Sequence, residues 1–149
     1  MMRASNKTRL TLETAAPTAI LETALYAPDL DAAEAFYGAL LGLAKVTRAG
    51  NRHVFFRLPT AMLLVFNPDE TGQPAAGPLP VPPHGARGPG HLAFAATDAE
   101  IDEWRQRFAA AGVAIEADFR WPGSDARSLY VRDPAGNSVE FAEPRLWGF

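Results

Sequence analysis

Hydrophobic and polar positions follow the same order twice along the chain. In residues 19–46 an apolar, strand-like run ends at Pro28-Asp29, a helix-like pattern follows, and Gly42 ends it. In residues 90–116 an apolar run ends at Thr97-Asp98, a helix-like pattern follows, and Gly112 ends it. The apolar positions of both patterns lie on one helix face: Leu30, Ala33, Tyr37, Leu40 and Leu41 in the first, Ile101, Trp104, Phe108 and Ala111 in the second. Asp or Thr before a helix and Gly after it are common caps, so each half is predicted to hold a strand and then a helix.

Three further strands are expected in each half. Alternating patterns that end in a proline turn, and the apolar runs after them, indicate these strands. They are residues 44 onward, 52–59 and 62–66 in the first half, and residues 113–116, 127–134 and 138–141 in the second. Each half then has the order strand–helix–strand–strand–strand.

One such half places a single helix on an open sheet and leaves the other face of that sheet uncovered. We therefore predict an α+β fold in which two βαβββ modules form a curved eight-stranded mixed sheet around a central pocket. The modules are residues 18–67 and 90–144 of one domain, residues 18–149, preceded by a flexible lead-in, residues 1–17. The Pro- and Gly-rich connection, residues 68–89, is expected to cross the surface near the pocket mouth without a regular helix or central strand.

Composition narrows the classes of function. The net charge of the 149 residues is -3, whereas nucleic acids and anionic membranes call for a basic surface. The chain has no cysteine, which excludes disulfides, thiolate metal sites and cysteine nucleophiles. It has no apolar run of the length that crosses a membrane. A cytoplasmic protein with neither nucleic acid nor membrane as partner is expected.

Three polar residues interrupt the apolar strands. Glu22 and His91 each precede the Asp near their helix start by seven residues, so they occupy equivalent places in the first strands of the two halves. Glu140 lies in the last strand of the second half. Two carboxylates and one imidazole that converge in a pocket suit a divalent metal such as Zn, Ni, Mn or Fe. Three protein ligands leave positions open for substrate, as in catalytic sites.

The segments YAPDLDAAEAFYGALLGL, GPGHLAFAATD and SLYVRDPAGNSVEFAEP resemble the vicinal oxygen chelate superfamily, which includes glyoxalases, bleomycin-resistance proteins and extradiol dioxygenases. In that family the metal ligands lie on the first and last strands of each half. The resemblance implies that Glu22, His91 and Glu140 are ligands. It places the fourth position at Leu64 or Val65, both apolar, so that ligand is missing here.

The resemblance implies a glyoxalase-like, metal-dependent enzyme of the lyase or isomerase type that acts on a small metal-chelating substrate. Glu22 or Glu140 would act as general base. Two alternatives stay open: a metal-free small-molecule binding protein of the bleomycin-resistance type, and an extradiol-type dioxygenase. Family members often pair, and some exchange halves between chains, so a homodimer is expected with its arrangement left open.

Structural roles remain alternatives for the same three residues. Glu22 could pair with Arg48 or Arg57, His91 could be a core histidine, and Glu140 could pair with Arg132. Five more residues are candidates for the substrate pocket: His84, Arg127, Tyr130, Phe56 and Trp121.

Overall fold

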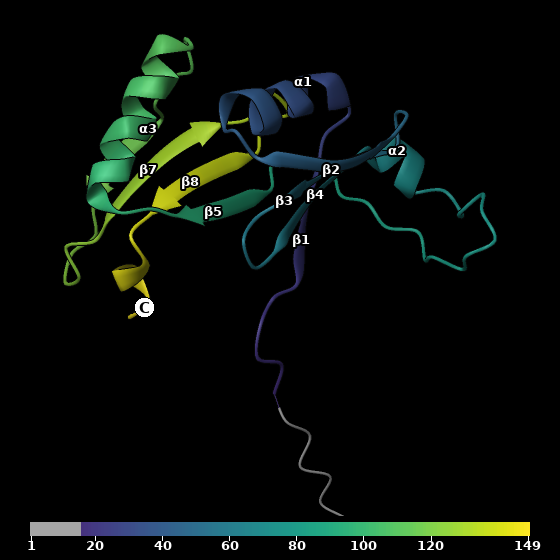
Figure 1. Ribbon diagram of the computed structural model, residues 1–149, viewed down its shortest axis with the longest axis horizontal. Coiled ribbons are helices and arrows are strands. Elements are labelled where there is room, and N and C mark those ends of the chain that lie inside the picture. Colours follow the sequence, from purple (N-terminus) through teal and green to yellow (C-terminus); the bar gives the residue numbers. More distant parts are fainter. Residues whose placement is uncertain (1–15) are drawn as a thin grey trace, which may run out of the picture.

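The computed structural model describes residues 16–149, so most of the expected lead-in lies outside the described residues. Two modules of the same order follow one another (Figure 1). The first contains β1 (Glu22–Tyr26), α1 (Leu30–Glu34), the π-helical η1 (Ala35–Leu40), β2 (Ala44–Ala49), β3 (His53–Arg57) and β4 (Met62–Phe66). The second contains β5 (His91–Ala95), α3 (Asp98–Ala110), β6 (Ala117–Arg120), β7 (Arg127–Arg132), β8 (Ser138–Ala142) and the 3-10 turn η2 (Pro144–Leu146).

The strands form two four-stranded mixed sheets with the same topology. Their orders are β1-β4-β3-β2 and β5-β8-β7-β6. The first and last strands of each module run parallel, and the other neighbours are antiparallel. The two-module α+β fold predicted from the sequence is therefore confirmed. The eight strands remain two open sheets, with α1 and α3 on the same side of the molecule (Figure 1).

Local signals explain where the two main helices begin and end. The Asp29 carboxylate accepts a hydrogen bond from the Ala32 N–H at 3.0 Å, and Thr97 forms a capping box with Glu100. Gly42 and Gly112 follow the helices with φ of 79° and 71°, a left-handed conformation that glycine adopts without strain.

Two details differ from the sequence-based expectation. The connection between modules opens with one helical turn, α2 (Pro68–Thr71), because the Asn67 side chain caps it and Pro68 tolerates the first helical position. The strand expected at residues 113–116 begins instead at Ala117, after an extended segment that joins the sheet through the Glu116 N–H and the Tyr130 carbonyl.

One hydrophobic core fills the space between the sheets and the helices. Tyr37, Phe56 and Leu63 from the first module and Phe108 and Leu129 from the second are among its fully buried side chains. The core is continuous across the module boundary, where Phe36 stacks on Phe108 with ring centroids 6.4 Å apart. Burial of this shared apolar area holds the two open modules together.

A buried polar network fixes the modules to each other. The Tyr37 hydroxyl donates to Asp133 Oδ2 at 2.7 Å, and Asn137 Nδ2 donates to the same oxygen at 2.9 Å. Asn137 Nδ2 also donates to the Tyr26 carbonyl at 3.1 Å, and Asn137 Oδ1 accepts from the Gly90 N–H at 2.7 Å. These contacts hold the end of β1 and the start of β5 against the turn between β7 and β8. They therefore set the relative position of the two open sheet faces.

Candidate active site

Each sheet has one face against the helices and one open face. Side chains alternate between the faces, and the strand register shows which residues share one. Glu22 is paired with Met62, and Ala24 with Leu64, so Glu22 and Leu64 lie on the open face of the first sheet. His91 is paired with Ser138, and Ala93 with Glu140, so His91 and Glu140 lie on the open face of the second sheet.

The same register decides the fourth position. Leu64 in the first module corresponds to Glu140 in the second, because each pairs with the third residue of its module's first strand. Val65 points to the opposite face and is completely buried. An apolar leucine therefore occupies the place where a fourth donor would stand.

His91 and Glu140 form a pair whose geometry suits a cation. His91 Nδ1 lies 3.2 Å from the Ser138 carbonyl oxygen, which can only accept, so this nitrogen carries the proton of the neutral ring. Nε2 of the neutral ring then points its lone pair at Glu140 Oε2, 3.2 Å away. Two acceptors at that distance require a proton or a metal ion between them.

The second oxygen of Glu140 strengthens the case for a metal. Its side chain is 8% exposed, and Oε1 is buried without a hydrogen-bond partner among residues 16–149. A buried carboxylate oxygen without a partner is costly, and coordination to a cation removes that cost. A His whose far nitrogen donates to a carbonyl is also the usual arrangement of a metal-ligating histidine. The donors present therefore fit a divalent ion.

Within one chain, however, the three predicted ligands do not meet. Among residues 16–149, no three His, Asp or Glu side chains lie close enough together to hold a metal ion. Glu22 is exposed on the first sheet, and it makes no ion pair or side-chain hydrogen bond within the described part of the chain. The structural alternatives are filled otherwise: Arg48 pairs with Glu34 and Asp31, and Arg132 pairs with Glu116.

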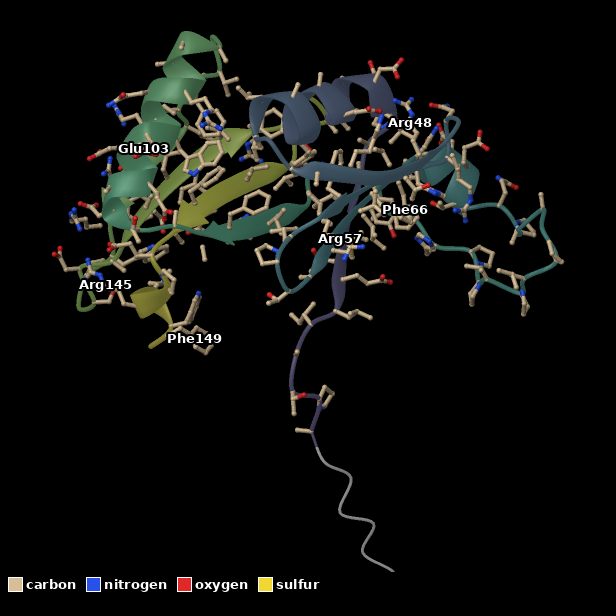
Figure 2. All side chains as sticks on the ribbon, viewed as in Figure 1. Arg48, Arg57, Phe66, Glu103, Arg145 and Phe149 are labelled. Carbon is tan, nitrogen blue, oxygen red and sulfur yellow. The ribbon has the colours of Figure 1, made fainter. Side chains whose placement is uncertain are left out.

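The open face of the first sheet carries a cavity of about 530 Å³. Phe55, Leu64 and Phe66 contribute apolar surface to it, and Val81, Pro82 and Pro83 of the connecting loop form another wall. Phe66 and Arg57 lie on the side of this sheet that faces away from α1 (Figure 2). The polar residues of the cavity are Glu22, Arg52, His53 and His84.

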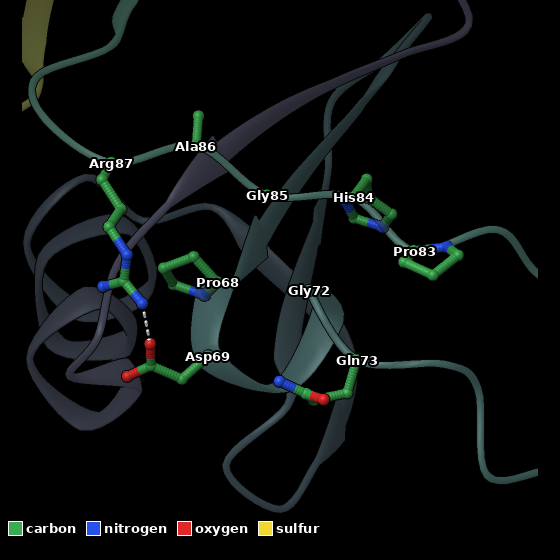
Figure 3. Close-up of a pocket in the computed structure, with 9 residues that line it drawn as sticks. All are labelled: Pro68, Asp69, Gly72, Gln73, Pro83, His84, Gly85, Ala86 and Arg87. Carbon is green, nitrogen blue, oxygen red and sulfur yellow. Dashed lines mark hydrogen bonds and ion pairs between the residues drawn. The ribbon is translucent and has the colours of Figure 1, made fainter.

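His84 anchors the connecting loop to this face. Its Nδ1 lies 2.8 Å from the Tyr26 hydroxyl, and its ring packs edge-on against Phe66 at 4.5 Å between centroids. The expected pocket residue His84 thus lines the cavity. Figure 3 shows the connecting loop passing beside α2. There Arg87 of the loop pairs with Asp69 of α2. The hollow drawn there includes none of the three candidate metal ligands.

Tyr130 and Trp121 lie on the open face of the second sheet. The Tyr130 ring stacks near His91, with centroids 6.3 Å apart, and burial together with the neighbouring Glu140 raises the pKa of its hydroxyl to about 12. Tyr130 is thus a neutral phenol beside the His91–Glu140 pair at physiological pH. Trp121 donates from Nε1 to the Ser128 hydroxyl at 2.8 Å.

The structure places the remaining two pocket candidates on the helix-facing side. Phe56 is completely buried in the core, and its neighbour Phe55 faces the cavity instead. Arg127 has a side chain only 13% exposed and pairs with Asp118, Asp98 and Asp102. These ion pairs raise the pKa of Arg127 and hold the guanidinium between α3 and β6, away from the open face.

Sequence reasoning missed four cavity residues: Arg52, His53, Phe55 and Phe66. The alternation of β3 was the available signal, since His53 and Phe55 share a face with the partners Phe66 and Leu64. Burial and the charge of Arg52 lower the pKa of His53, so this imidazole is neutral near pH 7.

Comparison with known families agrees with this architecture. The family model of the glyoxalase/bleomycin resistance protein/dioxygenase superfamily matches residues 19–141. The chain belongs to this superfamily. A crystal structure of lactoylglutathione lyase from Agrobacterium tumefaciens is 51% identical, covers 89% of this chain and 98% of its own, and superimposes with a TM-score of 0.84.

More distant members of the superfamily share the fold. A glyoxalase/bleomycin resistance protein/dioxygenase from Nocardioides is 23% identical over 88% of this chain and 86% of its own, with a TM-score of 0.68. A glyoxalase/dioxygenase from Nostoc punctiforme is 24% identical over 87% and 94%, with a TM-score of 0.61. A comparison with curated proteins found no match. Among residues 16–149 there is no helix long and apolar enough to span a membrane.

Proposed function

We propose that this superfamily member is a glyoxalase-like, metal-dependent enzyme of the lyase or isomerase type. Its substrate would be a small molecule that presents two oxygens on neighbouring carbons to the metal. The observation that carries the proposal is the His91–Glu140 pair, in which Nε2 faces a carboxylate whose other oxygen has no hydrogen-bond partner among the described residues. The 51% identity to a lactoylglutathione lyase supports the type of reaction.

Three side chains would hold the metal: Glu22, His91 and Glu140. Two carboxylates and one neutral imidazole balance the charge of a divalent ion, which offsets the desolvation of Glu140. Leu64 donates nothing, so positions remain open for substrate oxygens. Zn, Ni, Mn and Fe all accept this ligand set. When bound, the ion would supply Lewis-acid polarisation of a substrate carbonyl.

The protein's own residues would handle the proton. Isomerase chemistry between neighbouring carbons requires a base that removes a proton from one carbon and returns it to the other. Glu22 suits this role better than Glu140, because it is exposed and free of partners in the described part of the chain. Glu140 is fixed beside His91 and suits a permanent ligand. Tyr130, a neutral phenol, can donate a hydrogen bond to a substrate oxygen.

We further propose that the active form is a homodimer. Glu22 lies on one open sheet face and the His91–Glu140 pair on the other, and the two sheets of one chain do not close. In a twofold dimer, the Glu22 face of one chain can lie against the His91–Glu140 face of its partner, which forms two identical sites. The same contact would cover both open faces and exclude water from the chemistry.

Metal analysis combined with a thioester assay tests this function. We expect about one Zn, Ni, Mn or Fe per chain in the purified protein, and formation of a thioester from phenylglyoxal and a thiol, which chelation abolishes and metal restores. Glu140→Gln keeps the shape of the side chain but removes its charge, and should lose metal and activity. Glu103→Gln, on the outer face of α3 (Figure 2), is the matched control and should lose neither.

Two outcomes would contradict the proposal. Protein that binds no metal after reconstitution would favour the metal-free binding protein of the bleomycin-resistance type. Protein that binds metal equally well with Gln at position 140 would show that His91 and Glu140 are not its ligands.

A further inference from the structure

The cavity on the first sheet has an apolar body with polar groups at its ends. Phe55, Leu64 and Phe66 supply its floor, and the loop residues Pro82 and Pro83 supply part of its wall. Proline has no N–H, so these two wall residues cannot donate hydrogen bonds to peptide carbonyls. The middle of the cavity therefore favours a flat apolar group over a peptide, whose amides would lose their hydrogen bonds to water.

Aromatic rings are already arranged face to face and edge to face in this cavity. His53 stacks on Phe55 at 4.1 Å with an interplanar angle of 15°. Phe66 meets Phe55 edge-on at 5.2 Å, and His84 packs edge-on against Phe66 at 4.5 Å. A further ring can continue this cluster with offset or edge-to-face contacts, which add to the value of the buried area.

The guanidinium of Arg52 lies at one end of the cavity. Arg52 lines the cavity and makes no ion pair within residues 16–149. Its guanidinium lies 3.1 Å from His53 Nδ1, and because arginine can only donate, that nitrogen accepts and the His53 proton is on Nε2. Two N–H donors of this kind at the rim of an apolar cavity suit a carboxylate.

Glu22 stands at the other end. In the strand register Glu22 is paired with Met62, which is in turn paired with Arg57. His53 is paired with Phe66 at the opposite end of the strands. His53 and Arg57 are four residues apart in β3, which corresponds to about 13 Å along an extended strand. A ligand with one aromatic ring and a short chain spans most of this length.

We propose that this cavity binds the distal part of the substrate, an aromatic ring that carries a carboxylate, with the carboxylate at Arg52 and His53. This inference rests on the proposed function in one respect: the chelating oxygens of the substrate would lie at the Glu22 end. It assigns Arg52, His53, Phe55 and Phe66 as residues that select the substrate.

The test is calorimetric titration of the full-length protein after metal removal, so that its result does not depend on metal or turnover. The probes are trans-cinnamate, its neutral amide, and hexanoate, which has the charge but no ring. Cinnamate should bind at least about tenfold more tightly than either, because only cinnamate has both the ring and the charge. Arg52→Met should weaken cinnamate about tenfold and abolish the preference over the amide. Arg57→Met, which removes an equal charge at the other end of β3, should change cinnamate binding less than about twofold.

Several results would overturn the inference. Cinnamate that does not bind, or that binds no better than hexanoate, removes the case for an aromatic site. Equal losses in the two arginine variants would reduce the effect to net charge. Direct titration with S-hexylglutathione gives the last decision: if it binds, Arg52→Met weakens that binding, and cinnamate does not bind, the cavity holds a peptide thiol. The measurements of metal content and activity that test the proposed function do not depend on any of these outcomes.

Discussion

Asn137 is the residue whose loss should disturb the module boundary most. Its side chain makes three hydrogen bonds to three different elements: to Asp133 at 2.9 Å, to the Tyr26 carbonyl at 3.1 Å, and from the Gly90 N–H at 2.7 Å. Asn137→Ala removes all three and leaves the Asp133 carboxylate, which is 4% exposed, one donor short.

The expected loss of stability follows from the hydrogen bonds that Asn137 makes. A hydrogen bond to a charged group contributes about 1.5–3 kcal/mol and a neutral one about 1 kcal/mol, and local relaxation recovers part of the sum. We expect a loss of about 3–4 kcal/mol in the free energy of unfolding, a large share of the 5–15 kcal/mol typical of a domain. Tyr37→Phe removes one bond to the same carboxylate and should cost about 1.5–3 kcal/mol.

Urea unfolding followed by circular dichroism measures both changes, at one protein concentration because association would shift the midpoint. Asn51→Ala is the matched control: this asparagine lies in an exposed turn, so its loss should change stability by less than about 0.5 kcal/mol. An Asn137→Ala protein within about 1 kcal/mol of the wild type would refute the view that this network joins the modules.

Three further predictions concern single side chains. Burial and Arg52 lower the pKa of His53 below its usual 6.5, so the unfolded chain binds the proton first and stability should fall as the pH drops below 6.5. NMR titration should show this pKa, and Arg52→Met should raise it; an unchanged value would refute the charge effect. Arg127→Met should lower stability by about 1–3 kcal/mol, because it leaves Asp118 with one cation fewer, yet leave metal content unchanged; a metal-deficient variant would contradict its structural role. His84→Ala should speed amide hydrogen exchange in residues 72–90, and unchanged exchange would show that His84 does not hold the loop.

The placement of the candidate ligands was predictable because it depends on local periodicity. Glu22 and His91 share a spacing of seven residues to the helix start, and the alternation of strand residues fixes the face on which each lies. The segment His53–Arg57 was harder to interpret, since apolar residues at 54, 55 and 56 fill both faces. A shift of one residue exchanges the faces, which is why Phe56 was expected at the pocket and Phe55 is found there.

The expected convergence of the three ligands within one chain was wrong, because the pattern does not fix how the two sheets sit relative to each other. Repeated halves indicate two similar sheets, but the angle between them depends on contacts such as Tyr37 to Asp133, which join residues 96 positions apart. The direction of the Arg127 side chain was equally hard to predict, because its partners are distant in sequence. Its strand position allowed either face, and the acidic residues of α3 and β6, distant in sequence, decide that it points to the helix side.

The central claim is that Glu22 of one chain and the His91–Glu140 pair of another form one metal site. Complementation between two inactive variants tests it most directly. Glu22→Ala and Glu140→Ala proteins are each stripped of metal, mixed under conditions that exchange subunits, reloaded, and analysed for bound metal and turnover.

Each variant alone should hold little metal, whereas every mixed dimer should contain one site with all three ligands intact. Half of the dimers in an equal mixture are mixed, and one of the two sites in each is complete, so about a quarter of the wild-type metal and activity should return. No recovery after proven subunit exchange, with the wild type fully loaded under the same conditions, would contradict a site shared between chains.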